Sequence, residues 1–109
     1  MPSNAESMYQ LRFLPSALQD LTEIARYISH ELTNPEAAEK LSDEIIDAAE
    51  KLAAFPYAYA VYTPSRPLKH EYRRVPVKNY LIFYWIQEEE KEVVIARIIY
   101  GKRLYENKL

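Results

Sequence analysis

The fold of this chain is decided by the stretch NYLIFYWIQEEEKEVVIARIIYGKRLY, from Asn79 to Tyr105. Two apolar and aromatic runs, NYLIFYWIQ and EVVIARIIYG, are joined by the charged residues EEEK. Runs of this length, rich in β-branched and aromatic residues and separated by a short turn, are typical of an antiparallel pair of strands. The second run is apolar on both of its alternating sides, which favours an interior position in a sheet.

Two further strands and two helices are predicted on the N-terminal side of this pair. The segments MYQLRFLP (8–15) and LKHEYRRVPV (68–77) each alternate with a period of two, as strands do. Between them, apolar residues recur at helical spacing, in a first stripe and then a second. The first stripe contains Ala17, Leu21, Ile24, Ala25 and Ile28, and the second contains Ala38, Leu41, Ile45, Ala48 and Leu52.

The ends of the helices carry recognisable signals. Ser16, with Gln19 three positions later, forms a capping-box pattern for the first helix. Asn34 can cap the second helix and Pro35 suits its first position, whereas Phe55–Pro56 stops it. The short linker between the stripes predicts an antiparallel helical hairpin. The expected fold is therefore α+β: an N-terminal strand, the helical hairpin over one sheet face, and a three-strand antiparallel meander.

Length and composition limit the classes of function. A chain of 109 residues is long enough for one domain, which we place at 8–109, and residues 1–7 lack periodicity and are expected to be a flexible leader. There is no cysteine, and the two histidines are far apart, so neither a metal site nor a cofactor is expected. No apolar run approaches a membrane span and no signal peptide begins the chain, so we expect a cytoplasmic protein without a membrane partner.

Charge is divided unevenly along the chain. Residues 1–63 hold 4 Lys/Arg against 10 Asp/Glu, whereas residues 64–109 hold 10 against 6, so net charges of −6 and +4 lie behind the overall −2. The basic half is a candidate surface for anionic groups, and the acidic half is expected to face water or a basic partner.

Arg97 interrupts the apolar alternation of the last strand. Strand alternation would place it on the side of Val93, Ile95 and Ile99. An arginine there must pair with a carboxylate or reach solvent, because an unpaired buried charge is very costly. It either forms a structural ion pair or belongs to an anion-binding or target-binding patch. That candidate patch consists of Arg73, Arg74, Arg97, Lys102 and Arg103, and only one of the adjacent pair Arg73 and Arg74 can share the face of Arg97.

Other residues of chemical interest have both structural and functional interpretations. His70 is expected to begin a strand, as a surface residue or as a general acid or base. Gly101, the sole glycine, either ends the last strand or permits a close backbone approach. Tyr27, Tyr80 and Tyr84 lie at spacings compatible with the core.

These elements together resemble the RelE/ParE toxins of bacterial type II toxin–antitoxin modules. The resemblance runs from Met8 to the C-terminus, through YQLRFLPSALQDLTEIARYI, AAFP, LKHEYRRVPVKNYLIFYWI and VVIARIIYGKRLY. Its most specific parts are SALQDL after the first strand, YRR before the aromatic strand, and the RIIYGKR ending. Their order and spacing together make the match more specific than any one fragment.

The resemblance implies two activities. RelE-type members are ribosome-dependent mRNA endoribonucleases that use basic residues, often with a tyrosine or histidine. In this chain that role would fall to Arg73, Arg97, Arg103 and Tyr105. Where RelE has another arginine beside the strand tyrosine, however, Leu81 follows Tyr80 here.

ParE-type members have a longer helical hairpin, generally lack the nuclease residues and act on DNA gyrase. The long second helix, YRR and NYLIFY favour this branch, so the resemblance implies a growth-inhibiting toxin of the plasmid-stabilising kind without intrinsic catalysis. It also implies a cognate antitoxin, and a homodimer or a hetero-oligomer with that antitoxin. A degenerate, non-toxic module that only binds antitoxin is the third alternative.

Overall fold

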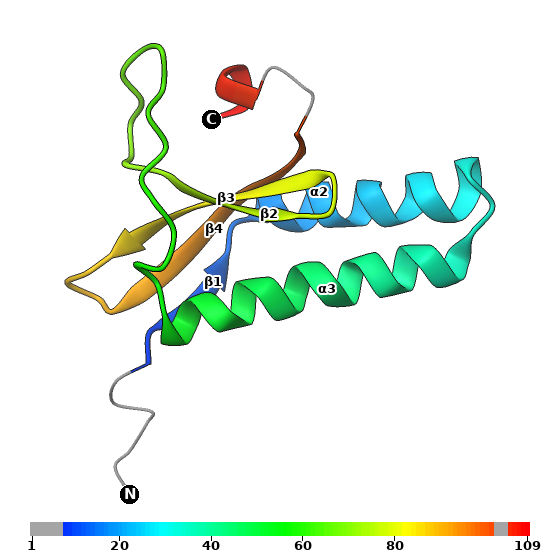
Figure 1. The fold of residues 1–109 in the computed structure, drawn as a ribbon, viewed down its shortest axis with the longest axis horizontal. Helices are drawn as coiled ribbons and strands as arrows, with labels where there is room; N and C mark the ends of the chain where they lie inside the picture. The colour runs from blue at the N-terminus through cyan, green and yellow to red at the C-terminus, as the bar shows by residue number, and fades with distance from the viewer. Residues whose placement is uncertain (1–7, 102–104) are drawn as a thin grey trace, which may run out of the picture.

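The computed structural model describes residues 8–101 and 105–109, so the predicted leader at 1–7 and the predicted site residues Lys102 and Arg103 lie outside it. Strands and helices follow one another in the expected order, with a short helical turn at the C-terminal end (Figure 1). The elements are β1 (Gln10–Phe13), α2 (Pro15–Arg26), the π-helical turn η1 (Tyr27–Glu31), α3 (Pro35–Ala54), β2 (Arg73–Val77), β3 (Tyr80–Gln87), β4 (Glu92–Tyr100) and the 3₁₀ turn η2 (Tyr105–Lys108).

The four strands form one mixed sheet in the order β1-β4-β3-β2. Strands β2, β3 and β4 pair antiparallel as the predicted meander, and β1 pairs parallel with β4. The interior position predicted for the last strand is confirmed. β1 pairs only with Glu92–Ile95, so within the described residues no strand pairs with that edge of β4 from Ala96 onward.

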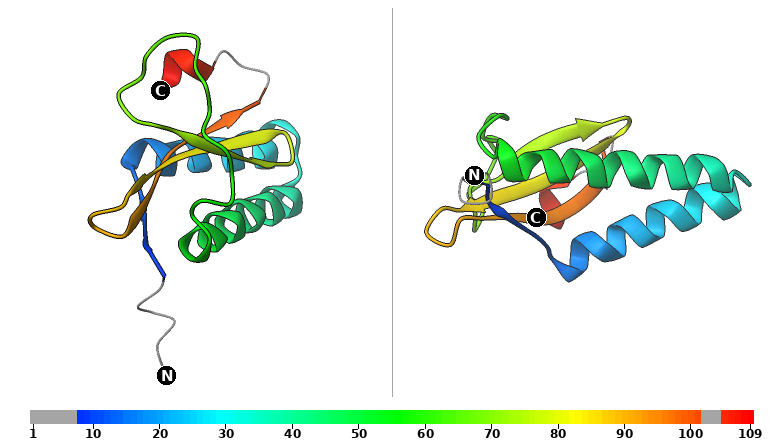
Figure 2. Two further views of the ribbon diagram at one scale, coloured as in Figure 1. Left: turned by 60° about the vertical axis from the view of Figure 1, so that its left-hand side comes forward. Right: turned by 90° about the horizontal axis from the view of Figure 1, so that it is seen from below.

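The helical hairpin covers one face of the sheet, and its tip projects beyond the strands (Figures 1 and 2). Both stripes point into this interface, where Ile45, Tyr84 and Ile95 are fully buried. The Asn34 cap is confirmed because its side chain accepts a hydrogen bond from the backbone N–H of Ala37 at 3.1 Å. The predicted core position of Tyr27 is wrong, since 53% of this residue is exposed near the hairpin tip.

The predicted capping role of Ser16 is wrong. The first helix begins at Pro15, two residues before the start that a Ser16 cap implies, with Leu14 as its N-cap and no side-chain cap. The Ser16 hydroxyl instead donates to the backbone carbonyl of Ala96 at 2.8 Å. Ser16 therefore satisfies a polar group on the edge of β4 that β1 leaves unpaired.

A β-bulge in β4 changes the face on which Arg97 lies. Tyr84 pairs with Ile95 and Phe83 pairs with Arg97, so Ala96 is the extra residue. Arg97 therefore lies on the face of Phe83 and Ile99, and the prediction that it shares the face of Val93 and Ile95 is wrong. Alternation alone could not show this, because one inserted residue reverses every later side chain.

The sheet face opposite the helices carries a second apolar cluster rather than an open surface. Residues 62–72 form an arm that projects from the sheet, and η2 lies near it (Figure 1). Tyr62 and Tyr72 of the arm are buried against Phe83 and Trp85, and Leu109 packs on the same cluster. β2 begins only at Arg73, so the prediction that His70 starts a strand is wrong.

Gly101 lies where the end of β4 meets the turn between β2 and β3. Its backbone N–H donates to the carbonyl of Asn79 at 2.8 Å. A Cβ atom at this position would lie 3.3 Å from that carbonyl oxygen, which is tighter than usual contact. The close-approach interpretation of this glycine is therefore supported.

Candidate functional site

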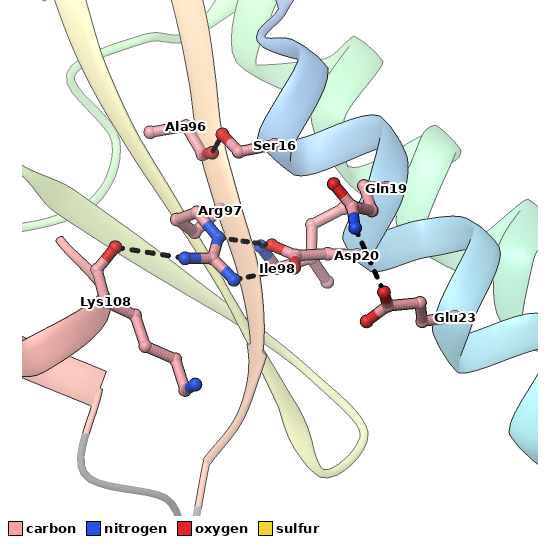
Figure 3. Close-up of polar contacts among 8 residues, drawn as sticks. All are labelled: Ser16, Gln19, Asp20, Glu23, Ala96, Arg97, Ile98 and Lys108. Atoms are coloured by element: carbon pink, nitrogen blue, oxygen red, sulfur yellow. Dashed lines mark hydrogen bonds and ion pairs between the residues drawn. The ribbon is translucent and has the colours of Figure 1, made fainter.

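Arg97, the central residue of the predicted anion site, is bound by a carboxylate from α2. Its Nε donates to Oδ2 of Asp20 at 2.6 Å, and its Nη2 donates to Oδ1 at 2.7 Å (Figure 3). Asp20 Oδ2 also accepts the backbone N–H of Ile98 at 2.9 Å. This is a two-pronged ion pair with an additional backbone bond, the arrangement that stabilises a buried charge best.

Both partners of this ion pair are largely buried, which is typical of an ion pair that supports the fold. The Asp20 side chain is 10% exposed and the Arg97 side chain 25%. The hydrogen bonds that Arg97 donates to Asp20, with the nearby negative charges of Asp20 and Glu23, raise the pKa of Arg97 despite burial. The ion-pair interpretation of Arg97 is therefore the one observed, and binding a phosphate there would require competition with Asp20.

Arg97 also contacts the C-terminal segment. Its Nη1 donates to the backbone carbonyl of Lys108 at 3.1 Å, on the side away from Asp20 (Figure 3). One guanidinium thus connects α2, β4 and η2. Tyr105 begins η2, but its side chain lies outside what the structure describes, as do Lys102 and Arg103.

The adjacent arginines of β2 lie on opposite faces of the sheet. Arg74 pairs with Phe83, which in turn pairs with Arg97, so these three residues share one face across three strands. With strands about 4.8 Å apart, the backbones of Arg74 and Arg97 are about 10 Å apart. The guanidinium of Arg74 lies 4.9 Å from the ring centroid of Tyr62.

Arg73 points the other way and holds the segment that follows α3. Its Nη1 donates to the backbone carbonyl of Tyr59 at 2.5 Å, and its guanidinium lies 5.0 Å from the ring centroid of Tyr57. The fold therefore brings Arg74 and Arg97 to one face and separates Arg73 from both. The predicted anion-binding patch is therefore split between the two faces of the sheet.

His70 lies in the arm and stacks on the only tryptophan of the chain. The ring centroids of His70 and Trp85 are 3.6 Å apart with an interplanar angle of 3°, and the Tyr72 ring meets both edge-on. Burial lowers the pKa of His70, and the nearby charge of Lys69 lowers it further. The neutral imidazole thus helps to fasten the arm to the sheet.

A polar cluster around Glu88 was not identified in the sequence. Glu88 accepts hydrogen bonds from the hydroxyls of Tyr9 and Tyr57, at 2.9 and 2.5 Å, and from the ammonium of Lys91. These bonds, with Lys91 the largest cause, lower the pKa of Glu88 to about 2. The sequence showed only a charged turn, because the two tyrosines come from distant segments.

Acidic residues line the outer face of α3. A shallow hollow there is bordered by Glu36, Glu39, Asp43 and Glu50, with Lys40 among them. The acidic half of the chain is thus concentrated on the helix layer, and the arginines of β2 lie in the sheet. Within residues 8–101 and 105–109 no three His, Cys, Asp or Glu side chains gather as a metal site, and no helix is long and apolar enough to cross a membrane.

Comparison with known proteins gives one family match. Residues 11–105 match the model for the ParE toxin of the type II toxin–antitoxin system parDE. No curated protein sequence matches the chain significantly.

Solved structures share the fold at low sequence identity. A chain of the chromosomal ParDE system from P. aeruginosa superposes with a TM-score of 0.72 at 21% identity, covering 88% of this chain and 99% of that one. The RelBE2 toxin–antitoxin complex from Mycobacterium tuberculosis superposes with a TM-score of 0.60 at 22% identity, covering 85% of this chain and 98% of that one. An archaeal RelE–RelB complex from Pyrococcus horikoshii superposes with a TM-score of 0.58 at 13% identity, covering 88% of this chain and 98% of that one.

Proposed function

Because the chain belongs to the ParE toxin family of type II toxin–antitoxin systems, we propose that it inhibits growth by binding a cellular protein, with DNA gyrase as the first candidate. The action is stoichiometric binding and not RNA cleavage. A cognate antitoxin neutralises it, and both proteins act in the cytoplasm.

The position of Arg97 is the observation that carries the choice between binding and cleavage. Cutting RNA requires a base for the ribose 2′-hydroxyl and a cation that can stabilise charge developing on the phosphate. Arg97 already bonds Asp20 through Nε and Nη2, and Arg73 lies on the other face of the sheet. Two of the four residues that a nuclease would use therefore cannot act on one phosphate without rearrangement.

Antitoxin binding is supported by the family and by the architecture of the neighbours, which include RelBE toxin–antitoxin complexes. We expect the antitoxin to contact the toxin through an extended or helical segment that becomes ordered on binding. Such coupled folding would make the toxin–antitoxin complex more resistant to unfolding than the toxin alone.

Controlled expression in bacteria tests toxicity. Induction of the chain alone should arrest growth, and co-expression of the antitoxin encoded beside it should restore growth. Normal growth with soluble, folded toxin would contradict the proposal, and antitoxin binding without toxicity would identify a degenerate module.

Mapping of mRNA 5′ ends on translating ribosomes separates the two mechanisms. The proposal predicts no codon-phased cuts after induction. If the wild-type chain produces such cuts and the Arg103→Ala variant does not, the chain is a RelE-type nuclease instead.

A further inference from the structure

The end of the helical hairpin extends beyond the apolar core. It consists of the last residues of α2, the π-helical turn η1 and the two residues after it, and we call residues 23–33 the hairpin tip. The tip projects past the strands (Figures 1 and 2). Within it, Ile24 and Ile28 pack against the core, and no residue of η1 is fully buried. Most of the tip is therefore open to a partner.

The backbone of the hairpin tip departs from regular helix at two places. η1 is a π-helical turn, and such turns occur frequently at functional sites. Thr33 ends the tip with a φ of 47°, in the left-handed region that a β-branched residue rarely adopts. A glycine there would connect the two helices without strain. Strained backbone of this kind is typical of segments that are held in one shape for binding.

Two large apolar side chains are exposed on the tip. Tyr27 is 53% exposed and Leu32 54%. The backbone N–H of Leu32 donates to the carbonyl of Tyr27 at 3.3 Å, so the two residues are held at the two ends of η1. Tyr27 also borders an open hollow of about 310 Å³. The other residues that line this hollow are Glu23, Arg26, His30 and Glu31.

Polar side chains of the hollow are available to a partner. Within the part of the chain that the structure describes, no side-chain hydrogen bond or ion pair joins Arg26, His30 or Glu31 to another residue. Acidic residues dominate around them, because residues 23–50 hold 8 Asp/Glu against 2 Lys/Arg, a net charge of −6. A surface of this charge repels nucleic acid and attracts a protein surface with basic side chains.

We propose that the hairpin tip is the surface through which the toxin binds its protein target, and that the target presents basic side chains around an apolar recess. This inference rests on the proposed function, in which the chain acts by binding a protein. Tyr27 and Leu32 enter the recess, and the carboxylate of Glu31 pairs with a cation on its rim. A projecting tip can reach into a recess, whereas the apolar residues of both sheet faces are already packed within the chain.

Growth arrest by tip variants, induced to matched levels of soluble protein, tests this proposal. Tyr27→Ser and Leu32→Ser should each need about tenfold more protein than the wild-type chain for half-maximal arrest, because truncating an apolar anchor of an interface costs affinity of that order. Glu31→Lys should also weaken arrest, since it places a cation against a basic partner.

Two variants outside the tip are the matched controls, and both should arrest growth like the wild-type chain. Leu18→Ser controls for the apolar changes, because Leu18 is 50% exposed on α2 before the tip begins. Glu89→Lys controls for the change of charge, because Glu89 lies in the turn between β3 and β4, at the other end of the molecule (Figure 1). Circular dichroism checks that each variant is folded, and Leu32→Ser serves if Tyr27→Ser fails to fold.

Several outcomes would overturn the proposal. Full arrest by the folded tip variants would do so, as would stronger arrest by Glu31→Lys or an equal loss in the two controls. If the tip variants keep full arrest and instead lose affinity for the antitoxin or self-association, the tip binds the antitoxin or a second copy. Absence of arrest by the wild-type chain would overturn the proposed function and this inference with it, whereas full arrest by the tip variants would overturn the inference alone.

Discussion

At the scale of single residues, Asp20 determines how Arg97 is held in the site. Its carboxylate accepts two bonds from Arg97 and one from the backbone N–H of Ile98. Ser16, one helical turn earlier, bonds the carbonyl of Ala96. These two side chains of α2 thus satisfy the edge of β4 beyond the end of β1, and Asp20 also fixes the direction of the Arg97 guanidinium.

Removing the Asp20 carboxylate should destabilise the protein strongly. Asp20→Ala leaves Arg97 partly buried without its counter-charge, and we expect the free energy of unfolding to fall by about 2–4 kcal/mol, somewhat less than for a fully buried pair. Urea denaturation monitored by circular dichroism measures the change. The free energy of unfolding should fall less in the double variant Asp20→Leu/Arg97→Leu than in Asp20→Ala, because the double variant leaves no charge unpaired.

The exposed pair of Arg12 and Glu92 provides the control for this prediction. Its nitrogen–oxygen distance is 3.0 Å, but 49% of the Arg12 side chain is exposed. Arg12→Ala should therefore cost less than about 1 kcal/mol. Equal losses in Arg12→Ala and Asp20→Ala would contradict the structural role of the Asp20 pair.

The sequence could limit Arg97 to two interpretations but could not choose between them. A strand arginine among apolar residues signals pairing or solvent access, whereas its partner lies 77 positions away. The bulge at Ala96 also made the face of Arg97 unpredictable, since no residue type there indicates a bulge. Identifying Asp20 would have required knowing where α2 lies against β4.

At the scale of elements, the arm and the turn between β3 and β4 are each held by one polar or aromatic cluster. The arm rests on the stacked rings of His70 and Trp85. The turn is held by Glu88, which joins β1 through Tyr9 and the segment after α3 through Tyr57. Both clusters contain a group with a shifted pKa, so both are testable by pH.

Fluorescence of Trp85 should report the protonation of His70. Burial holds the pKa of His70 below 6.5, so the folded state binds its proton less readily than the unfolded state does. Trp85 emission should change with a midpoint below pH 6.5, and stability should fall as pH drops below 6.5. His70→Gln should abolish the emission change and His30→Gln should retain it; a titration that survives His70→Gln would refute the assignment.

Acid should weaken the Glu88 cluster. Because its pKa is lowered from the usual 4.5 to about 2, Glu88 contributes stability that is present above pH 4.5 and is lost as pH falls toward 2. Glu88→Gln should therefore lower the urea midpoint at pH 6 and make less difference near pH 2. Glu89→Gln, at the next position, is the control and should change neither midpoint; equal effects of the two variants would count against the cluster.

Element order was predictable because periodicity switches clearly between 3.6 and 2 along the chain. The Asn34 cap and the interior position of β4 followed from local signals and were confirmed. The arm was not predictable, because LKHEY alternates like a strand although only residues from Arg73 onward pair with β3. Pairing depends on where the chain returns to the sheet, which alternation does not encode.

At the scale of the whole molecule, an acidic helix layer lies on one face of the sheet, and Tyr62, Tyr72 and Leu109 pack on apolar residues of the other face. The resemblance to RelE/ParE toxins, read from the order of short fragments, is confirmed by the family match over residues 11–105. The target was not predictable, because ParDE and RelBE structures share this fold and a fold does not determine a function.

Supercoiling by purified DNA gyrase shows most directly whether this toxin acts by binding a protein target. Supercoiling of relaxed plasmid should be inhibited when folded chain is added in amounts comparable to gyrase, and addition of the antitoxin first should prevent the inhibition. Arg97→Ala with Asp20→Leu, if folded, should still inhibit, because these residues support the fold. Full supercoiling in the presence of excess folded toxin would contradict inhibition of gyrase by direct binding.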